Sequence, residues 1–300
     1  MLDRIVLTRD LVDAHGIVLA RCGFVVSPSL VQETAQRAPA LARTAISGTP
    51  LAEDLSLPLA DPPYRHLFHG RGVGASVRRA LLGIRLPAPL FDELLALKAS
   101  DPVRYRHGLT TAAVAARLII AAVGEAAALA EFAAAGLLHD IGMRHVSFHL
   151  VRNTDALEPR EVRDVAAHPL LGAWHLAGLL GVHPAVEAAL AHHWRNGYGY
   201  PALPRPPMRA VEVVGVASAF AALTQARPYR SEPYDGRGAV DVLVAEARAG
   251  QRDTDTVRLL VHALRGARGE VRGVALARAR LGHAPSDNRH TAIAPQRASG

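Results

Sequence analysis

Apolar residues recur at helical spacing over much of this chain, most clearly after residue 100. Positions three and four apart share one face of a helix, so the spacing predicts helices with a buried side. Asp101-Pro102 has the form of a cap followed by a first-turn proline, and Gly124 is expected to end the helix that starts there. We expect helices over residues 105–123, 125–138, 159–180, 184–193, 208–224, 236–249 and 255–264.

The pattern before residue 86 is different. Residues 5–26 are rich in valine, isoleucine and leucine and are interrupted by Gly16 and Gly23, which predicts a short β-hairpin or small sheet. Ser27-Pro28 again has the form of a helix start. Residues 47–63 combine several prolines with few periodic apolar positions, so we expect a linker there.

Together these elements predict a mainly α fold, a helical bundle preceded by a small β-containing N-terminal domain. Half of the 300 residues are hydrophobic, which is enough to bury one substantial core and a smaller one. We place an N-terminal α+β domain with its linker at 1–95, the helical domain at 96–282 and a flexible basic tail at 283–300. No repeat of fixed period is present.

Cysteine content and apolar runs bear on the compartment. The single cysteine, Cys22, excludes an intrachain disulfide and gives no indication of an oxidising environment. Four charged residues among the first ten leave no apolar core for a signal peptide. Residues 112–138 are interrupted by Arg117, Glu125 and Glu131, which is typical of buried helices rather than of a membrane span. We therefore expect a cytoplasmic protein without a membrane span.

The net charge of +7 is concentrated at one end. From Arg265 onward the chain has seven arginines and two acidic residues, a net charge of +5. No aromatic residue interleaves these arginines, so a solvated tail is favoured over an arm that binds nucleic acid or a membrane. We expect no specific nucleic-acid binding.

Six residues in four places are candidates for a metal site. Their histidines fall near the ends of expected helices, at intervals of 24 to 32 residues, which is about one helix plus one loop. Successive helices of a bundle can therefore bring them to one pocket. They are His107, His139, Asp140, His168, His192 and His193.

Neutral imidazoles with a carboxylate that can bridge are the ligands that a pair of transition-metal ions requires. The chain has 15 histidines, however, and a single histidine in an alanine-rich helix is usually a surface residue or a satisfied core residue. On spacing alone, a metal site and an incidental set of histidines are about equally supported.

A series of short motifs extends this pattern. Leu137-Leu138-His139-Asp140-Ile141-Gly142 is followed by His168-Pro169, the pair His192-His193, Asn196-Gly197-Tyr198-Gly199-Tyr200-Pro201 and a segment from Ala222 to Arg230. In order and spacing these motifs resemble the HD-GYP family over residues 100 to 265. That family consists of bacterial phosphodiesterases that open cyclic di-GMP at a centre of two or three metal ions, often iron or manganese. The resemblance implies an HD-type helical bundle.

The resemblance also implies a role for each matching residue. His107, His139 and Asp140 correspond to ligands of one metal, with Asp140 as the bridge and the catalytic carboxylate. The ligands on the second side correspond to His168, His192 and His193. Arg227 and Arg230 match an arginine-rich segment that faces the substrate phosphates, and Tyr200 lies in the signature loop beside the pocket. Without the motif, these arginines fit an exposed turn and the loop an ordinary glycine-proline turn.

Several positions depart from the family pattern. Ser218 stands where a metal-binding aspartate is usual, and Met143 replaces the lysine of the HD-x-x-K run. Arg144 is adjacent, but a shift of one residue turns a helical side chain by about 100°. The remaining departures are Trp194 for glutamate, Asn196 for aspartate and Val103 for the glutamate of three-metal members.

Two functions therefore compete. The chain is either a metal-dependent phosphodiesterase for cyclic di-GMP, with two divalent ions and a weakened first site, or a module with little turnover. That module would bind a cyclic dinucleotide, a signalling protein or a second copy of the chain. A different phosphate ester stays open as substrate, because HD-type cradles are chemically generic.

Two N-terminal features add little. Residues 10–20 are weakly similar to the β-rich segment that precedes the catalytic domain in some HD-GYP proteins, and they lack the phospho-acceptor pattern of a receiver domain. His66 and His69 lie three apart in a linker-like region and are more often incidental than ligands.

Overall fold

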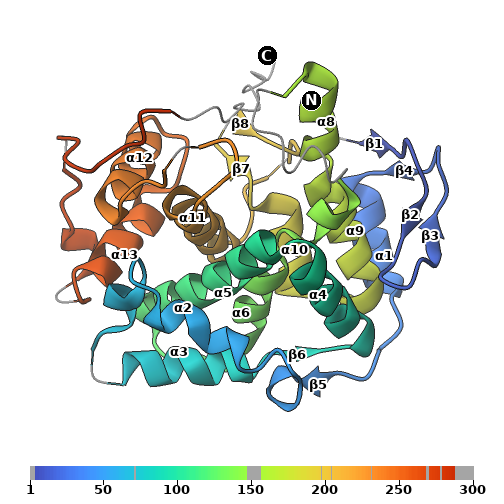
Figure 1. Ribbon diagram of the computed structural model, residues 1–300, viewed down its shortest axis with the longest axis horizontal. Coiled ribbons are helices and arrows are strands. Elements are labelled where there is room, and N and C mark those ends of the chain that lie inside the picture. Colours follow the sequence, from blue (N-terminus) through green and yellow to red (C-terminus); the bar gives the residue numbers. More distant parts are fainter. Residues whose placement is uncertain are drawn as a thin grey trace.

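A computed structural model describes residues 4–70, 72–146, 157–196, 198–203, 205–230, 232–267, 270–277 and 279–287. The chain is mainly helical with small β-hairpins near its N-terminus, as the sequence predicts. In Figure 1 helices α5 and α6 lie in the middle of the bundle, with the N-terminal strands, α1 and α9 on one side and α12 and α13 on the other.

Helix α5 (Pro102–Val123) is the central helix of the bundle, and nearly all of its residues between 104 and 119 are buried. It packs against α6 (Leu129–Leu138), α11 (Arg209–Thr224) and α13 (Thr254–Leu264). The Asp101 side chain caps α5 by accepting a hydrogen bond from the backbone N–H of Arg104 at 3.0 Å, and Gly124 ends it with φ of 78°.

By length and composition, α5 is also the one helix among the described residues that could cross a membrane. In the structure 72% of its most apolar window is buried against other parts of the chain. Its Arg117 is 2% exposed and donates a hydrogen bond from Nε to the Leu67 carbonyl at 2.6 Å. The burial and the satisfied arginine are those of a core helix.

The later helices follow the predicted ranges with two corrections. The expected helix at 159–180 is two helices, α8 (Pro159–Ala166) and α9 (His168–Leu180), because Pro169 has no N–H to continue the ladder and instead occupies the first turn of α9. Helix α6 begins at Leu129 rather than at 125, and the Glu125 carboxylate before it is paired with Arg79 at 2.9 Å. Helices α10 (Pro184–Ala191) and α12 (Gly236–Arg248) complete this set.

The N-terminal strands form two antiparallel pairs. β1 (Ile5–Val6) pairs with β4 (Val25–Val26), and β2 (Leu11–Val12) pairs with β3 (Val18–Ala20). Helix α1 (Pro28–Arg37) follows and packs on α9, with its N-terminus capped by the Ser27 hydroxyl. The predicted β segment and helix start are therefore confirmed.

The predicted linker at 47–63 is wrong. This segment contains the short helices η1 (Ile46–Gly48), η2 (Asp54–Ser56) and α2 (Leu57–Ala60), and Leu51 and Leu55 are each only 1% exposed. Prolines break the helical period there, but short turns still direct the leucines inward. The next elements are η3 (Arg65–Phe68), α3 (Val73–Leu82) and α4 (Ala88–Ser100), with β5 (Thr44–Ala45) pairing with β6 (Arg85–Leu86).

One hydrophobic core extends from Ile5 to Ala263 and includes residues on both sides of position 95. The two predicted parts therefore share one core. The division between them at position 95 stays a prediction. At the other end, η5 (Val271–Gly273) precedes the predicted basic tail. Of that tail, residues 288–300 lie outside the described part of the chain.

Candidate metal centre

Helix ends deliver the six predicted ligands. His107 lies in the second turn of α5, His139 is the residue that follows α6, and His168 is the first residue of α9. His192 directly follows α10, and Asp140 precedes the short helix η4 (Ile141–His145). Helix α6 packs against α5 and α10, and α10 packs against α9, so these helices bring the ligands together as the sequence predicts.

The ligand atoms form two groups that could each hold a metal ion. We call His107, His139 and Asp140 the first ligand group and His168, His192 and His193 the second ligand group. Within each group the ligand atoms lie within 4.8 Å of one another. His139 and His192 join the groups, with ring centroids 4.9 Å apart.

Backbone carbonyls fix how three of the imidazoles face. Nδ1 of His139 donates to the Gly136 carbonyl at 2.8 Å, and Nδ1 of His168 donates to the Val165 carbonyl at 2.6 Å. In the same way, Nδ1 of His192 donates to the Ala189 carbonyl at 3.0 Å. A carbonyl oxygen can only accept a hydrogen bond, so Nδ1 carries the proton. In the neutral ring, Nε2 then has a lone pair that can bind a metal.

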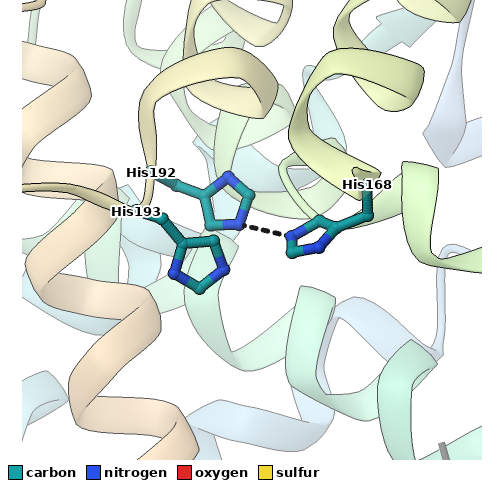
Figure 2. A group of neighbouring side chains, drawn as sticks. All are labelled: His168, His192 and His193. Atoms are coloured by element: carbon teal, nitrogen blue, oxygen red, sulfur yellow. Dashed lines mark hydrogen bonds between the residues drawn. The ribbon is translucent and has the colours of Figure 1, made fainter. Parts of the chain in front are cut away.

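In the second ligand group, acceptor atoms face one another (Figure 2). Nε2 of His168 lies 3.1 Å from Nε2 of His192 and 3.2 Å from Oδ1 of Asp140. Lone pairs this close repel unless a proton or a cation lies between them. The donor set therefore fits a divalent transition-metal ion.

Burial keeps the histidines in the neutral form that binds metal. Burial, aided by the nearby charge of Arg227, holds the pKa of His107 well below 6.5. Burial likewise lowers the pKa of His139, and burial with neighbouring histidines holds the pKa values of His192 and His193 well below 6.5. Protons therefore compete weakly with a metal at these four rings.

Asp140 is the carboxylate between the two groups. Burial raises its pKa, but the contacts with His168 and His139 and the charge of Arg104 outweigh burial and hold the pKa well below 3.8. Its Oδ1 lies toward His168 and His192, whereas Oδ2 lies 3.8 Å from Nε of Arg104. This placement suits the bridging role that the resemblance implies.

Ser218 lies beside the first ligand group, at the position where the family pattern has an aspartate. Its Oγ lies 3.1 Å from Nε2 of His139 and 3.3 Å from Nε2 of His107. Nδ1 of His107 lies 3.2 Å from Oε1 of Gln225, so Nε2 of both histidines is left as an acceptor. The Ser218 hydroxyl has one proton, so it can donate a hydrogen bond to only one of these two Nε2 atoms.

Two glycines hold the His139-Asp140 segment against α9. A Cβ on Gly142 would lie 2.1 Å from the His168 carbonyl oxygen and 2.5 Å from the amide nitrogen of Gly172. A Cβ on Gly172 would in turn lie 2.9 Å from the amide nitrogen of Gly142. Only glycines allow the backbones to approach this closely, and their contact sets the distance between Asp140 and His168.

The signature loop is a small hairpin beside the second ligand group. β7 (Trp194–Arg195) pairs with β8 (Tyr198–Gly199), and Gly199 has φ of 91° with no room for a Cβ against the His193 carbonyl. The hairpin stacks the Tyr200 ring on His193 at 4.5 Å between centroids. Tyr200 therefore contacts a predicted ligand, and its contact with substrate stays a prediction.

The two arginines of the predicted phosphate segment differ in their contacts. Arg230 donates from Nη1 to the Leu223 carbonyl at 2.7 Å, at the C-terminal end of α11, which is a structural contact. The charge of Arg227 helps to lower the pKa of His107. Among the described residues, Nε of each arginine is buried and has no hydrogen-bond partner. Phosphate binding stays a prediction for both, and the effect on His107 favours Arg227.

The remaining sequence features lie away from the two groups. His66 and His69 are exposed and contact each other with ring centroids 5.4 Å apart, so they belong to neither ligand group. Val103 is 48% exposed. Sequence reasoning missed one residue, Arg104, whose signal was its place three residues before His107 on the same helical face.

Comparison with known proteins gives relatives of one kind. No family model matches the chain. The chain is 29% identical over 133 residues to a 3′3′-cGAMP-specific phosphodiesterase of Vibrio cholerae, which covers 42% of this chain and 30% of that protein. It is 32% identical over 151 residues to a cyclic di-GMP phosphodiesterase of Pseudomonas aeruginosa, which covers 49% of this chain and 36% of that protein. The chain thus matches about a third of the length of each.

Two solved structures are also similar. The HD domain of the phosphodiesterase PgpH of L. monocytogenes matches with a TM-score of 0.46 and 16% identity, covering 57% of this chain and 94% of that one. An HDG"Y"P protein from Bdellovibrio bacteriovorus matches with a TM-score of 0.47 and 15% identity, covering 79% and 78%. Over less than half of its length, the chain is thus similar in sequence to two bacterial cyclic dinucleotide phosphodiesterases.

Proposed function

We propose that this chain is a metal-dependent phosphodiesterase that opens a cyclic dinucleotide, with cyclic di-GMP as the first substrate to test. The observation that carries the proposal is the convergence of the Nε2 atoms of His168 and His192 on the Asp140 carboxylate, from helices far apart in sequence. Both curated relatives act on cyclic dinucleotides by name.

The residues would divide the work between metal binding and substrate binding. When bound, a pair of divalent ions supplies an acidified water and positive charge at the phosphoryl oxygens. The first and second ligand groups would hold the ions, with the Asp140 carboxylate available to both. Iron or manganese is the expected metal, because imidazole suits iron and carboxylate suits manganese.

Ring opening is a hydrolysis. A water oxygen forms a new bond to phosphorus, the bond from phosphorus to the leaving ribose oxygen breaks, and that oxygen takes a proton. The chain contributes positioning and charge rather than a covalent nucleophile. Arg227, whose charge helps to lower the pKa of His107, would contact a phosphate oxygen with its guanidinium.

A second function is favoured by Ser218. Its hydroxyl lies between two Nε2 atoms of the first ligand group, where it offers a neutral and weak ligand instead of a carboxylate. A weak first site would leave a protein that binds a cyclic dinucleotide and turns it over slowly, as a signalling module with a protein partner or a second copy.

Metal analysis combined with a turnover assay separates the two functions. The protein is purified with added manganese or iron, its bound metal is measured per chain, and conversion of cyclic di-GMP to the linear dinucleotide is followed by chromatography. Metal at both ligand groups with metal-dependent ring opening supports the phosphodiesterase. Metal-replete protein that opens neither cyclic di-GMP nor 3′3′-cGAMP rules it out, and tight nucleotide binding without metal favours the module.

A further inference from the structure

Arg104, whose Nε lies 3.8 Å from Oδ2 of Asp140, lines a cleft of about 240 Å³. The end of α4, the first turn of α5 and η4 line it, with Ser100, Arg104, Met143 and Arg144 among its residues. Ligand pockets are usually ~300–1,000 Å³, so this cleft has room for part of a dinucleotide, such as one phosphodiester with its sugar. It is the natural place to look for the cation that Met143 lacks.

Arg144, the neighbour of Met143, does not supply that cation. Its guanidinium makes an ion pair with Glu93, which is 2% exposed. If Arg144 moved away, the buried Glu93 carboxylate would be left without its partner, which is strongly unfavourable. The ion pair therefore holds Arg144 in place. The charge adjacent to Met143 in sequence is therefore already neutralised by α4.

Arg104 is the cation that lines the same cleft and also lies next to the predicted ligands. It is 8% exposed, with Nε 3.8 Å from Oδ2 of Asp140 and Nη1 3.4 Å from Oδ2 of Asp101. A guanidinium has five N–H donors, so these two carboxylates leave donors for a further oxygen. Its planar fork matches two oxygens of a phosphate.

We propose that Arg104 binds a nonbridging phosphate oxygen of the substrate in this cleft, in place of the lysine that Met143 replaces. The inference rests on the proposed function and names the group that holds the phosphate beside Asp140. Arg104 and Met143 line the same cleft, so a cation at either position reaches the same phosphate.

The test compares four variants. Arg104→Met removes the cation, Arg104→Lys keeps the charge without the fork, and Arg104→Met with Met143→Lys returns a cation to the same cleft. Arg106→Met is the matched control, because Arg106 is exposed, two residues away, and paired with Asp61 at 2.7 Å. Each protein is measured for bound metal per chain, for affinity toward inorganic phosphate and cyclic di-GMP, and for turnover.

Arg104→Met is expected to keep its metal and to lose phosphate and dinucleotide affinity by roughly 10-fold or more, the value of a charged hydrogen bond. Arg104→Lys should lose less, the double variant should recover most of the affinity, and Arg106→Met should match the parent. Affinity in Arg104→Met within twofold of the parent overturns the inference. Loss of metal in that variant also overturns it, because Arg104 would then only position Asp140.

The two proposals can fail separately. If the parent binds phosphate through Arg104 but opens no cyclic dinucleotide, the proposed function fails and the inference on Arg104 stands. If the parent opens the ring and Arg104→Met does so equally well, the function stands and the inference fails. Lack of recovery in the double variant, with metal and folding intact, also counts against a phosphate site shared with Met143.

Discussion

Oγ of Ser218 lies 3.1 Å from Nε2 of His139, inside the first ligand group. Ser218→Asp would place a carboxylate among these lone pairs, and a carboxylate binds divalent metals far better than a neutral hydroxyl. We expect roughly 10-fold tighter metal binding at the first ligand group, a magnitude comparable to that of a metal-orienting contact. Isothermal titration with manganese checks this.

Ser218→Asn is the matched control for that substitution, since it has nearly the shape of aspartate but no charge. Equal metal affinity in the aspartate and asparagine variants would contradict the prediction and would indicate that the first ligand group holds no metal in this protein. Turnover should rise along with occupancy if the phosphodiesterase function is correct.

Asp140→Asn removes the charge of the bridging carboxylate with little change in shape. Because Asp140 is the acidic member of the ligand set, we expect metal content per chain to fall at both ligand groups and turnover to fall with it. Elemental analysis of the purified variant measures the first effect. A variant that keeps the full metal content of the parent would show that Asp140 is not a ligand.

Buried histidines outside the metal centre should make folding stability fall in mild acid. Burial, with the charge of Arg144 nearby, lowers the pKa of His175 to about 4, although Asp13 opposes the shift. Burial and the charge of Arg43 lower the pKa of His183 to about 4, and its Nδ1 accepts a hydrogen bond from the Ala185 amide. A protonated His183 could not accept that bond.

The direction follows from proton binding. Below the ordinary histidine pKa of 6.5, the unfolded chain binds protons that the folded chain excludes, so the free energy of unfolding falls as pH falls from about 6.5 toward 4. Each histidine contributes a slope of up to about 1.4 kcal/mol per pH unit. Urea unfolding at pH 7.5, 6 and 5 measures the slope.

His183→Gln should flatten this dependence, whereas His66→Gln, at an exposed position, should leave it unchanged. The metal is removed with chelator before these measurements, because bound metal would also respond to pH at the ligand histidines. A slope that is the same in His183→Gln and in the parent would contradict the assignment of His183.

The candidate metal ligands could be predicted from the sequence better than the residues around them. His107, His139, Asp140 and His168 are recognisable because helix-plus-loop spacing repeats, and a bundle turns such spacing into proximity. The contacts that decide the chemistry at Arg104 depend on three-dimensional packing. The Arg104 guanidinium lies near Asp140, whereas the Arg144 guanidinium is paired with Glu93 of α4. From the sequence alone, Arg144 is the expected substitute because it is adjacent to Met143.

The N-terminal half shows the same limit for the fold. Short turns at 46–60 bury Leu51 and Leu55, and η2 packs against α3 and α5, but each turn is too short for a period to emerge from proline-rich sequence. Helical periodicity can be seen in the sequence of a long element such as α5. It cannot be seen where each short turn buries a single apolar side chain. The split at His168 was readable from Pro169 alone.

The glycine contact behind the metal centre gives a last prediction. In Gly142→Ala the new Cβ would meet the His168 carbonyl oxygen at 2.1 Å, so either α9 or η4 must move. Overpacking of this kind usually costs about 1–3 kcal/mol. Because the His168 carbonyl belongs to a ligand residue, the shift should also separate His168 from Asp140 and reduce metal binding at the second ligand group.

Gly48→Ala is the matched control, since a Cβ at Gly48 meets nothing within 4 Å. It should change the free energy of unfolding by no more than about 0.5 kcal/mol and leave metal content unchanged. Urea unfolding and elemental analysis on both variants separate a general loss of stability from a specific loss of metal. Gly142→Ala with the stability and the metal content of Gly48→Ala would show that the close approach of η4 and α9 does not set the geometry of the centre, and the distance between Asp140 and His168 would need another cause.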